Sequence, residues 1–131
     1  MIFLTYLYKK IMITAAVVTF HTSRKDLIRL IDCVLHSSID KFFIIDNSTN
    51  DALREFESTS ERITYIYSDN LGFGSGHNVA INRAMDLGCD YHIIINPDIY
   101  WDEYVIEKLT QFMNENRDCG LDMPKIIYPK A

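Results

Sequence analysis

Aspartate and asparagine side chains gather at three places in the sequence, each directly after an apolar run. Carboxylates and amides in such places can hold a divalent cation together with phosphate oxygens. A fourth polar cluster, 19-TFHT-22, follows the first apolar run of the chain. The three clusters rich in aspartate and asparagine are 46-DNSTND-51, 69-DN-70 and 96-NPD-98.

The stretch 69-DNLGFGSGHN-78 holds three of the five glycines of the chain. A glycine-rich turn between a strand and a helix is a common way to bind phosphate. The dinucleotide fingerprint G-x-G-x-x-G normally follows the first strand of its unit, whereas this stretch follows the third, and His77 stands where the last glycine should be. The stretch also lacks the lysine of a P-loop. A nicotinamide or flavin site is therefore disfavoured, and two interpretations remain: a phosphate-ligand loop of another kind, or a flexible turn.

The elements that must position these residues alternate along the chain. Continuous apolar runs predict strands, and a helical spacing of apolar residues predicts the helices between them. Ser23 is a candidate cap for the first helix and Gly88 for the end of the third. The predicted strands span 12–20, 41–47, 62–68 and 90–98; the helices span 23–38, 50–58, 77–88 and 101–116; and 120–131 has room for one more short strand.

This alternation predicts an α/β protein, a Rossmann-like three-layer sandwich with a mainly parallel central sheet. Ligands of such sheets bind at the carboxyl ends of the strands, near the point where strand order reverses. Each predicted strand ends in a polar cluster, so we expect the clusters to share one rim. Turns also need polar residues, so Asp46, Asp51 and Asp98 have an alternative interpretation as turn or helix-cap residues.

Length and composition indicate one compact domain. The chain has 131 residues, 48% of them hydrophobic, and a net charge of −5 with no lysine/arginine block, so no nucleic-acid partner is expected. Three dispersed cysteines predict buried thiols in a reducing compartment. We expect a domain over 12–131 and an extension over 1–11, which either touches a membrane or precedes a natural start at Met12. The order of its charged and apolar residues does not fit a signal peptide.

Four segments of the sequence together resemble family 2 glycosyltransferases of the GT-A fold. They are AAVVTFHTS, FFIIDNSTND, NLGFGSGHNVAINRA and YHIIINPDI, in this order. The similarity covers nearly the whole chain from Met12 onward and is strongest to the bacterial rhamnosyltransferase-like branch, which builds cell-surface polysaccharides. Each segment alone is weak, but four in order are quite specific.

The resemblance implies a nucleotide-diphosphate sugar as donor and a divalent metal, Mn or Mg, as cofactor. Asp46 corresponds to the acidic residue that accepts a hydrogen bond from a pyrimidine base, and His77 would donate to phosphate. Asp98 corresponds to the metal-binding carboxylate of the family's Asp-x-Asp motif. The residues implied to lie at the donor nucleotide and sugar are Thr19, His21, Asp46, Asn70, Gly72, His77, Asn78 and Asn96.

Two departures from the family pattern limit what the resemblance implies. His21 stands where the family commonly has asparagine. Family members also continue beyond the equivalent of Ala131 into a half that holds the acceptor glycan, or lipid-linked glycan, and the catalytic base. We therefore expect an incomplete GT-A domain with no assignable base, neither Asp102 nor Glu103 being recommended by a motif. On this basis the chain alone should bind donor weakly without transferring sugar.

Two other functions compete with inverting sugar transfer. A non-catalytic α/β domain would bind a nucleotide, or nothing, and form homo-oligomers through exposed apolar surface. A nucleotidyltransferase would share the sheet and the metal chemistry, but it would want a loop rich in glycine, arginine and lysine after the first strand, which TFHTS does not provide. The expected location is the cytoplasm, or the periphery of the inner face of the membrane.

Overall fold

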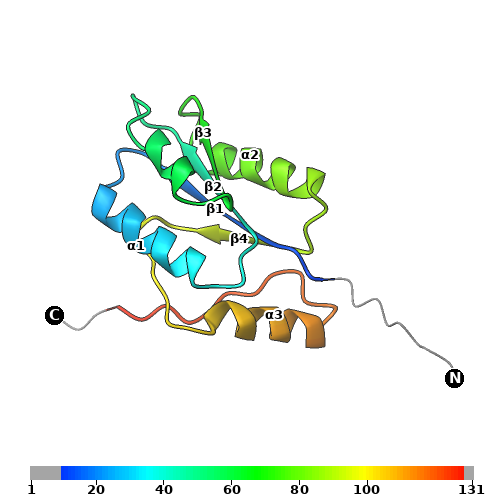
Figure 1. Ribbon diagram of the computed structural model, residues 1–131. Coiled ribbons are helices and arrows are strands. Elements are labelled where there is room, and N and C mark those ends of the chain that lie inside the picture. Colours follow the sequence, from blue (N-terminus) through cyan, green and yellow to red (C-terminus); the bar gives the residue numbers. More distant parts are fainter. Residues whose placement is uncertain (1–9, 129–131) are drawn as a thin grey trace, which may run out of the picture.

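The computed structural model describes residues 10–128, so residues 1–9 of the expected extension lie outside the described residues. At the centre is a sheet in which β1 (Ile13–Thr19) pairs with both β2 (Lys41–Asp46) and β4 (Tyr91–Ile95), while β2 also pairs with β3 (Ile63–Tyr67). All of these pairings are parallel, and the strand order is β3-β2-β1-β4 (Figure 1). The predicted α/β class and its parallel sheet are confirmed.

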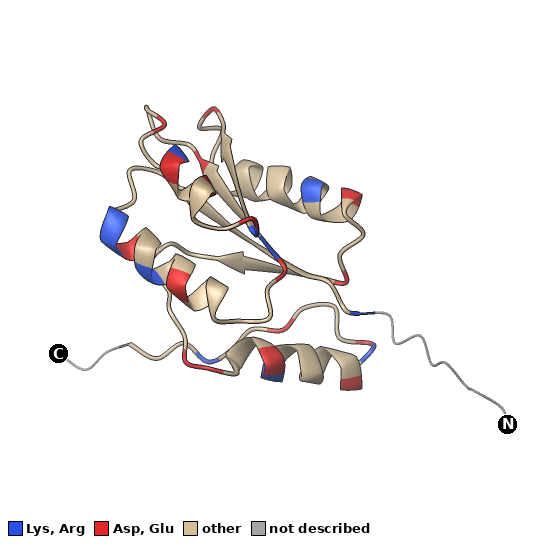
Figure 2. Cartoon of the chain, viewed as in Figure 1, with Lys and Arg blue, Asp and Glu red and all other residues tan. Residues whose placement is uncertain are grey.

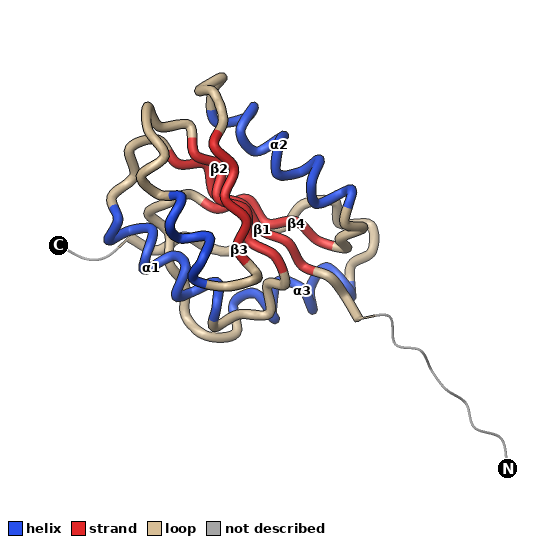
Figure 3. Tube along the Cα trace, turned by 45° about the horizontal axis from the view of Figure 1, so that its top comes forward, coloured by secondary structure: helices blue, strands red, loops and turns tan. Residues whose placement is uncertain are grey.

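Helices cover both faces of this sheet and make it the middle of three layers (Figure 3). One apolar cluster draws on α1 (Arg24–Leu35), the 3-10 helix η1 (Arg54–Thr59) and α3 (Val105–Glu115), and a second cluster draws on α2 (Phe73–Asp86). Alternate residues of β1 divide between the two clusters, as the two-residue period of a strand requires. Because both of its faces are covered, the sheet is mainly apolar, and nearly all charged residues lie on helices and loops (Figure 2).

Two helix ends agree with their predicted capping residues. The Ser23 hydroxyl oxygen accepts a hydrogen bond from the Asp26 backbone N–H at 3.1 Å and so caps α1. Gly88 follows α2 with a φ of +69°, the left-handed conformation that commonly ends a helix.

Other predicted boundaries are wrong for local reasons. The helix predicted over 50–58 is the shorter η1. Leu53, the residue before it, and Phe56 within it are both buried, because three-residue spacing aligns side chains in a 3-10 helix. The helix predicted from 101 begins at Val105, because Tyr104 has a φ of +71° that an α-helix cannot contain. Ile106 is the buried residue of α3.

Two further expectations fail in the C-terminal part and at the cysteines. Residues 117–128 form no strand, and Leu121 and Ile127 stay exposed because no strand of the sheet pairs with this segment. The thiols of Cys33, Cys89 and Cys119 are partly exposed rather than buried.

The glycine-rich stretch proves to be mostly helix. α2 begins at Phe73, four residues before the predicted start, so Gly74 and Gly76 are helical. Gly72 precedes the helix with a φ of +100°, which favours glycine. A Cβ at position 76 would lie 2.7 Å from a Val18 methyl carbon, so Gly76 lets α2 approach β1 closely. Gly76 therefore serves the packing of α2 against β1.

We expect Gly76→Ala to destabilise the fold by roughly 1–2 kcal/mol, because overpacking outweighs the gain in helix propensity. Gly74→Ala is the matched control. A Cβ there meets nothing within 4 Å, so this change should stabilise the protein by up to about 1 kcal/mol. Urea unfolding of the two variants measures the difference. Equal stability of the variants would contradict the tight contact between α2 and β1.

Candidate functional site

The strand order reverses at β1, and this places the candidate site. The chain passes from β1 outward to β2 and β3, and then returns to pair β4 with the other side of β1. Val17 lies opposite Ile95 in that pairing, so Thr19 and the Asn96–Asp98 turn come to the same end of the sheet. In open α/β sheets this is where ligands bind. We call the carboxyl ends of the strands, with the turns that follow them, the rim.

Asp46 is the most strongly anchored residue of the rim. It is the last residue of β2, and its side chain is 0% exposed. Oδ1 accepts hydrogen bonds from the Thr19 hydroxyl at 3.0 Å and from the Ser48 N–H at 3.1 Å, while Oδ2 accepts from the Tyr65 hydroxyl at 2.6 Å. Thr19 and Asp46 are therefore brought together as predicted from the sequence. Asp46 therefore starts the turn after β2, through its bond to the Ser48 N–H, and also ties the ends of β1 and β2 to β3.

His21 lies in the turn after β1, where its backbone has a φ of +49°. Its N–H donates to Ser48 Oγ at 2.8 Å, and its imidazole Nε2 lies 3.3 Å from Thr49 Oγ1. The ring of Phe20 packs edge-on against that imidazole at 4.7 Å and is 56% exposed. The turn after β1 is thus held against the turn after β2, and it presents an aromatic ring to solvent.

The segment after β3 brings the backbone of α2 to the surface. Asn70 Oδ1 accepts from the Gly72 N–H at 3.3 Å, and both residues are exposed. The residue before α2 is Gly72, which has no side chain, and within residues 10–128 no side chain accepts a hydrogen bond from the first N–H groups of this helix. Asn78, in the second turn of α2, is also exposed.

His77 departs most from its predicted place. It is 3% exposed, its ring packs edge-on against Phe73 at 4.5 Å, and neither ring nitrogen has a hydrogen-bond partner. Burial lowers its pKa and favours the neutral ring. The ring lies beneath α2 and not on the exposed rim, because α2 already includes residue 77. Its contact with phosphate stays a prediction.

A second histidine lies on the same face of the sheet. His92 of β4 faces Thr14 of β1, whose Oγ1 is 2.7 Å from His92 Nδ1. Burial, with a smaller contribution from His77, lowers the pKa of His92 to about 4. Both rings are therefore neutral near pH 7, and they pack under α2 as polar members of an otherwise apolar layer.

Asp98 projects from the turn that follows β4. The Ile99 N–H donates to the Asn96 carbonyl oxygen at 3.2 Å, and Asn96 and Asp98 are both exposed. The alternative interpretation of Asp98 as a cap of the following helix is wrong, because α3 begins after Tyr104. Asp51 does not cap a helix either. Its carboxylate accepts from Arg54 Nε at 2.9 Å, while η1 starts after Leu53.

A divalent cation at Asp98 would need ligands beyond this carboxylate. Within residues 10–128 no group of three or more His, Cys, Asp or Glu side chains is placed to hold a metal ion. Mg²⁺ is often bound by one or two carboxylates, with phosphate oxygens and water completing the shell. The exposed Asp98 carboxylate, which makes no hydrogen bond or ion pair with the described part of the chain, fits that kind of site.

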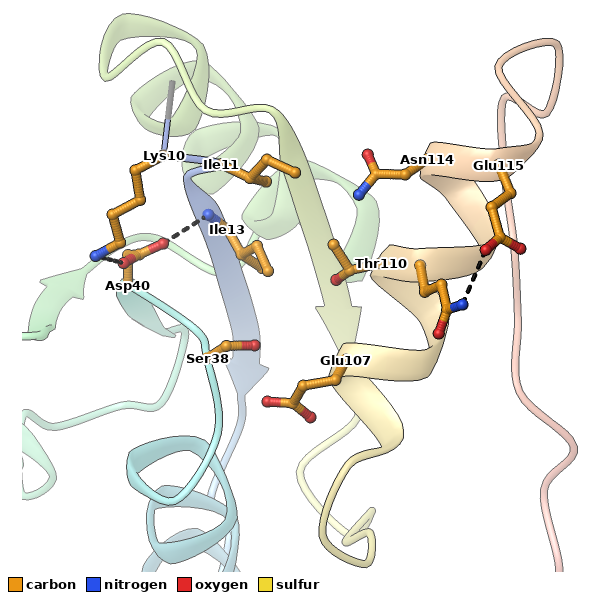
Figure 4. A pocket seen from close by; sticks show the side chains of 10 residues that line it. Lys10, Ile11, Ile13, Ser38, Asp40, Glu107, Thr110, Asn114 and Glu115 are labelled. Carbon is orange, nitrogen blue, oxygen red and sulfur yellow. Dashed lines mark hydrogen bonds and ion pairs between the residues drawn. The ribbon is translucent and has the colours of Figure 1, made fainter. Parts of the chain in front are cut away.

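Two cavities lie away from the rim. One of about 430 Å³ is at the opposite end of the sheet, where Figure 4 shows the Lys10–Asp40 ion pair facing residues of α3 such as Glu107 and Asn114. Another, of about 350 Å³, lies between the C-terminal half of α1 and the residues before α3, and Asp102 and Glu103 line it. These two carboxylates are therefore not brought to the rim.

The bond from the buried Tyr65 hydroxyl to Asp46 is a contact at the rim that the sequence did not predict. Ser48 belongs to the cluster 46-DNSTND-51, which was expected at the rim. A signal was present, because a tyrosine at an inward strand position needs a partner for its hydroxyl when it is buried. Which partner it finds depends on the pairing of β3 with β2.

Comparison with protein families agrees with this arrangement. The sequence model of the family described as Glycosyl transferase family 2 matches residues 15–127, from β1 to the segment after α3. No curated protein sequence matches the chain. Among the described residues, no helix has the length and apolar character needed to cross a membrane.

Proposed function

The chain belongs to glycosyl transferase family 2, and from that premise we propose that its rim binds a nucleotide-diphosphate sugar with a divalent metal, Mn or Mg. The observation that carries the proposal is the reversal of strand order at β1, which brings the ends of β1, β2 and β4 to one rim. Asp46 is bonded to Thr19 at the end of β1, while Asp98 is exposed in the turn after β4. Ligands of open α/β sheets bind at this point.

Two parts of the rim suit different parts of the donor. The exposed Phe20 ring offers a stacking face to a nucleobase, since aromatic side chains stack on bases of every kind. The N–H groups at the start of α2 and the positive end of its dipole suit the diphosphate. The exposed residues that then line the nucleotide and the sugar are His21, Asn70, Gly72, Asn78 and Asn96. Thr19 is buried and supports this rim through its bond to Asp46.

Recognition of the base by Asp46 takes a more specific form. A carboxylate has about four acceptor positions, and three of those on Asp46 are occupied by protein donors. The remaining position is on Oδ2, which is buried. A pyrimidine N–H would bind there only after the neighbouring turns move, so the greater part of the proposed role of Asp46 is to hold Thr19 and Ser48.

Asp98 is the residue that would hold the metal. When bound, the cation neutralises the negative charge that the diphosphate leaving group gains as the sugar is transferred. The carboxylate of Asp98 supplies one hard oxygen ligand, and Pro97 restricts the backbone before it. The turn from Asn96 to Ile99 holds that ligand at the end of β4.

The finer assignment follows the resemblance given above. We propose inverting transfer of a hexosyl unit such as rhamnose to a glycan or lipid-linked glycan acceptor, in cytoplasmic synthesis of a cell-surface polysaccharide close to the inner face of the membrane. The attacking hydroxyl needs a base as well as a bound donor. We assign no residue of 10–128 to that step.

A thermal-shift panel of nucleotide sugars, with and without Mn²⁺ or Mg²⁺, tests the proposed function. A donor at about 100 times its dissociation constant should stabilise the fold by about 2.7 kcal/mol. The absence of any shift with every pyrimidine and purine nucleotide sugar, in both metals, would refute the proposal.

Asp98→Asn should remove the metal-dependent part of donor binding and leave the fold intact, because the side chain is exposed. We expect the added stabilisation by Mn²⁺ to disappear while the metal-independent shift remains. Asp118→Asn, at an exposed aspartate after α3, is the matched control and should behave as wild type. A folded Asp98→Asn variant with full metal dependence would exclude Asp98 as the ligand.

A further inference from the structure

We propose that Tyr65 is a positioning residue of the rim, acting through Asp46. It lies on β3, which β2 separates from β1. Its hydroxyl is the donor that fixes Oδ2 of the Asp46 carboxylate. The effect on donor binding rests on the proposed function, whereas the effect on the rim does not.

The Tyr65 hydroxyl is buried, and it donates its hydrogen bond to Asp46. The side chain is 5% exposed and its ring belongs to the apolar cluster of α1 and η1, with the Arg54 guanidinium 5.1 Å from the ring centroid. Burial and the bond to Asp46 raise the pKa of Tyr65, so the hydroxyl keeps its proton and donates it to Oδ2. A buried hydroxyl without such a partner would be costly.

Fixing one oxygen of a carboxylate fixes the other. The χ2 torsion of aspartate is broad, so a carboxylate held at one oxygen alone can rotate. Tyr65 holds Oδ2 while Thr19 and Ser48 donate to Oδ1, which sets the plane of the group. Loss of the Tyr65 hydroxyl would free that plane and weaken both bonds to Oδ1.

The chain of hydrogen bonds continues from Asp46 to the rim. The Ser48 N–H donates to Asp46, and Ser48 Oγ accepts from the His21 N–H at 2.8 Å. His21 has a φ of +49°, a conformation rare outside glycine that needs support from its surroundings. The structure thus links the hydroxyl of β3 to the turn after β1 through two residues, Asp46 and Ser48.

Plain core packing is the competing explanation, and Tyr65→Phe separates the two because it keeps the ring and removes the hydroxyl. Tyr67→Phe is the matched control, since Tyr67 lies two residues on along β3 and is 46% exposed. Amide hydrogen exchange without ligand is the first measurement. We expect exchange at Ser48 and His21 to become about tenfold faster in Tyr65→Phe and to stay unchanged in Tyr67→Phe.

Affinity for UDP and dTDP with Mn²⁺ is the second measurement. Tyr65→Phe should weaken binding about tenfold, as expected for loss of a hydrogen bond to a charged group. In an Asp46→Ala background, the same change should have little further effect, because Tyr65 acts through Asp46 and alanine offers its hydroxyl no partner. Additive losses in the double variant would overturn the proposal.

The two measurements separate the possible failures. Unchanged amide exchange at Ser48 and His21 in Tyr65→Phe would refute the positioning role whatever binds at the rim. Faster exchange in a protein whose wild type binds no nucleotide would support the link to the rim and refute the proposed function instead. If Tyr65→Phe does not fold, Asp46→Ala removes the acceptor of the Tyr65, Thr19 and Ser48 donors together, and unchanged exchange at Ser48 and His21 in that variant would also refute the role.

Discussion

Arg62→Met is expected to destabilise the fold by roughly 3–4 kcal/mol. The guanidinium donates to the carbonyl oxygens of Val34, Leu35, Ser37 and Ile39, at the end of α1 and in the link to β2. The last carbonyl groups of a helix have no partner within the helix, and here one cation satisfies several of them. Methionine keeps much of the apolar stem and removes every donor. Urea or thermal unfolding measures the loss.

Arg62→Lys distinguishes geometry from charge. A lysine ammonium keeps the positive charge but lacks the planar fork that reaches several acceptors together, so we expect an intermediate loss. Arg83→Met, at an exposed residue of α2, should change stability little. If Arg62→Met were no more destabilising than Arg83→Met, the carbonyl contacts would carry no net stabilisation.

Acidification is the second change expected to have a large effect, through His92. The unfolded chain binds a proton on this histidine near its ordinary pKa of 6.5, whereas the folded protein binds it only near pH 4. The unfolded state therefore gains protons first, and stability falls as pH falls from about 6.5 to about 4. We expect a loss of roughly 2 kcal/mol, a figure reduced from the full shift because the ring is partly exposed.

His92→Asn should remove this acid-dependent loss, because asparagine can still bond to Thr14 but does not titrate. His36→Asn, at a histidine whose side chain is 78% exposed, is the matched control. The free energy of unfolding of all three proteins, measured at pH 7, 5.5 and 4.5, isolates the contribution of His92. The same slope in His92→Asn and wild type would show that other groups cause the acid sensitivity.

The sequence was sufficient for the strands and for part of the rim. Continuous apolar runs identify β1 and β2 because a parallel strand covered on both faces must be apolar throughout. Both strands end in polar residues, so the meeting of Thr19 with Asp46 follows from parallel pairing. The position of Asn96 and Asp98 after β4 follows in the same way.

Tertiary contacts determine the start of α2 and the hydrogen bond between Tyr65 and Asp46, which the sequence did not predict. Glycines have poor helix propensity, so the stretch before His77 was predicted as a loop. In the structure this stretch is helical from Phe73, and Gly76 packs closely against Val18 of β1. Because α2 begins at Phe73, His77 lies inside the helix and is buried. The bond from Tyr65 to Asp46 depends on the pairing of β3 with β2, which no local pattern encodes.

The central position of β1 has a consequence for folding. The residues that join β1 to the start of β2 are 27 apart in sequence, as in the bond between Ile13 and Asp40, whereas Thr14 and His92, which join β1 to β4, are 78 apart. Closing the longer loop costs about 1 kcal/mol more in chain entropy. We therefore expect β4 to join a preformed β1–β2–β3 unit, so that the part of the rim between β1 and β4 is the last to assemble. Trp101, the only tryptophan of the chain, follows β4, and its fluorescence during refolding would report that late step.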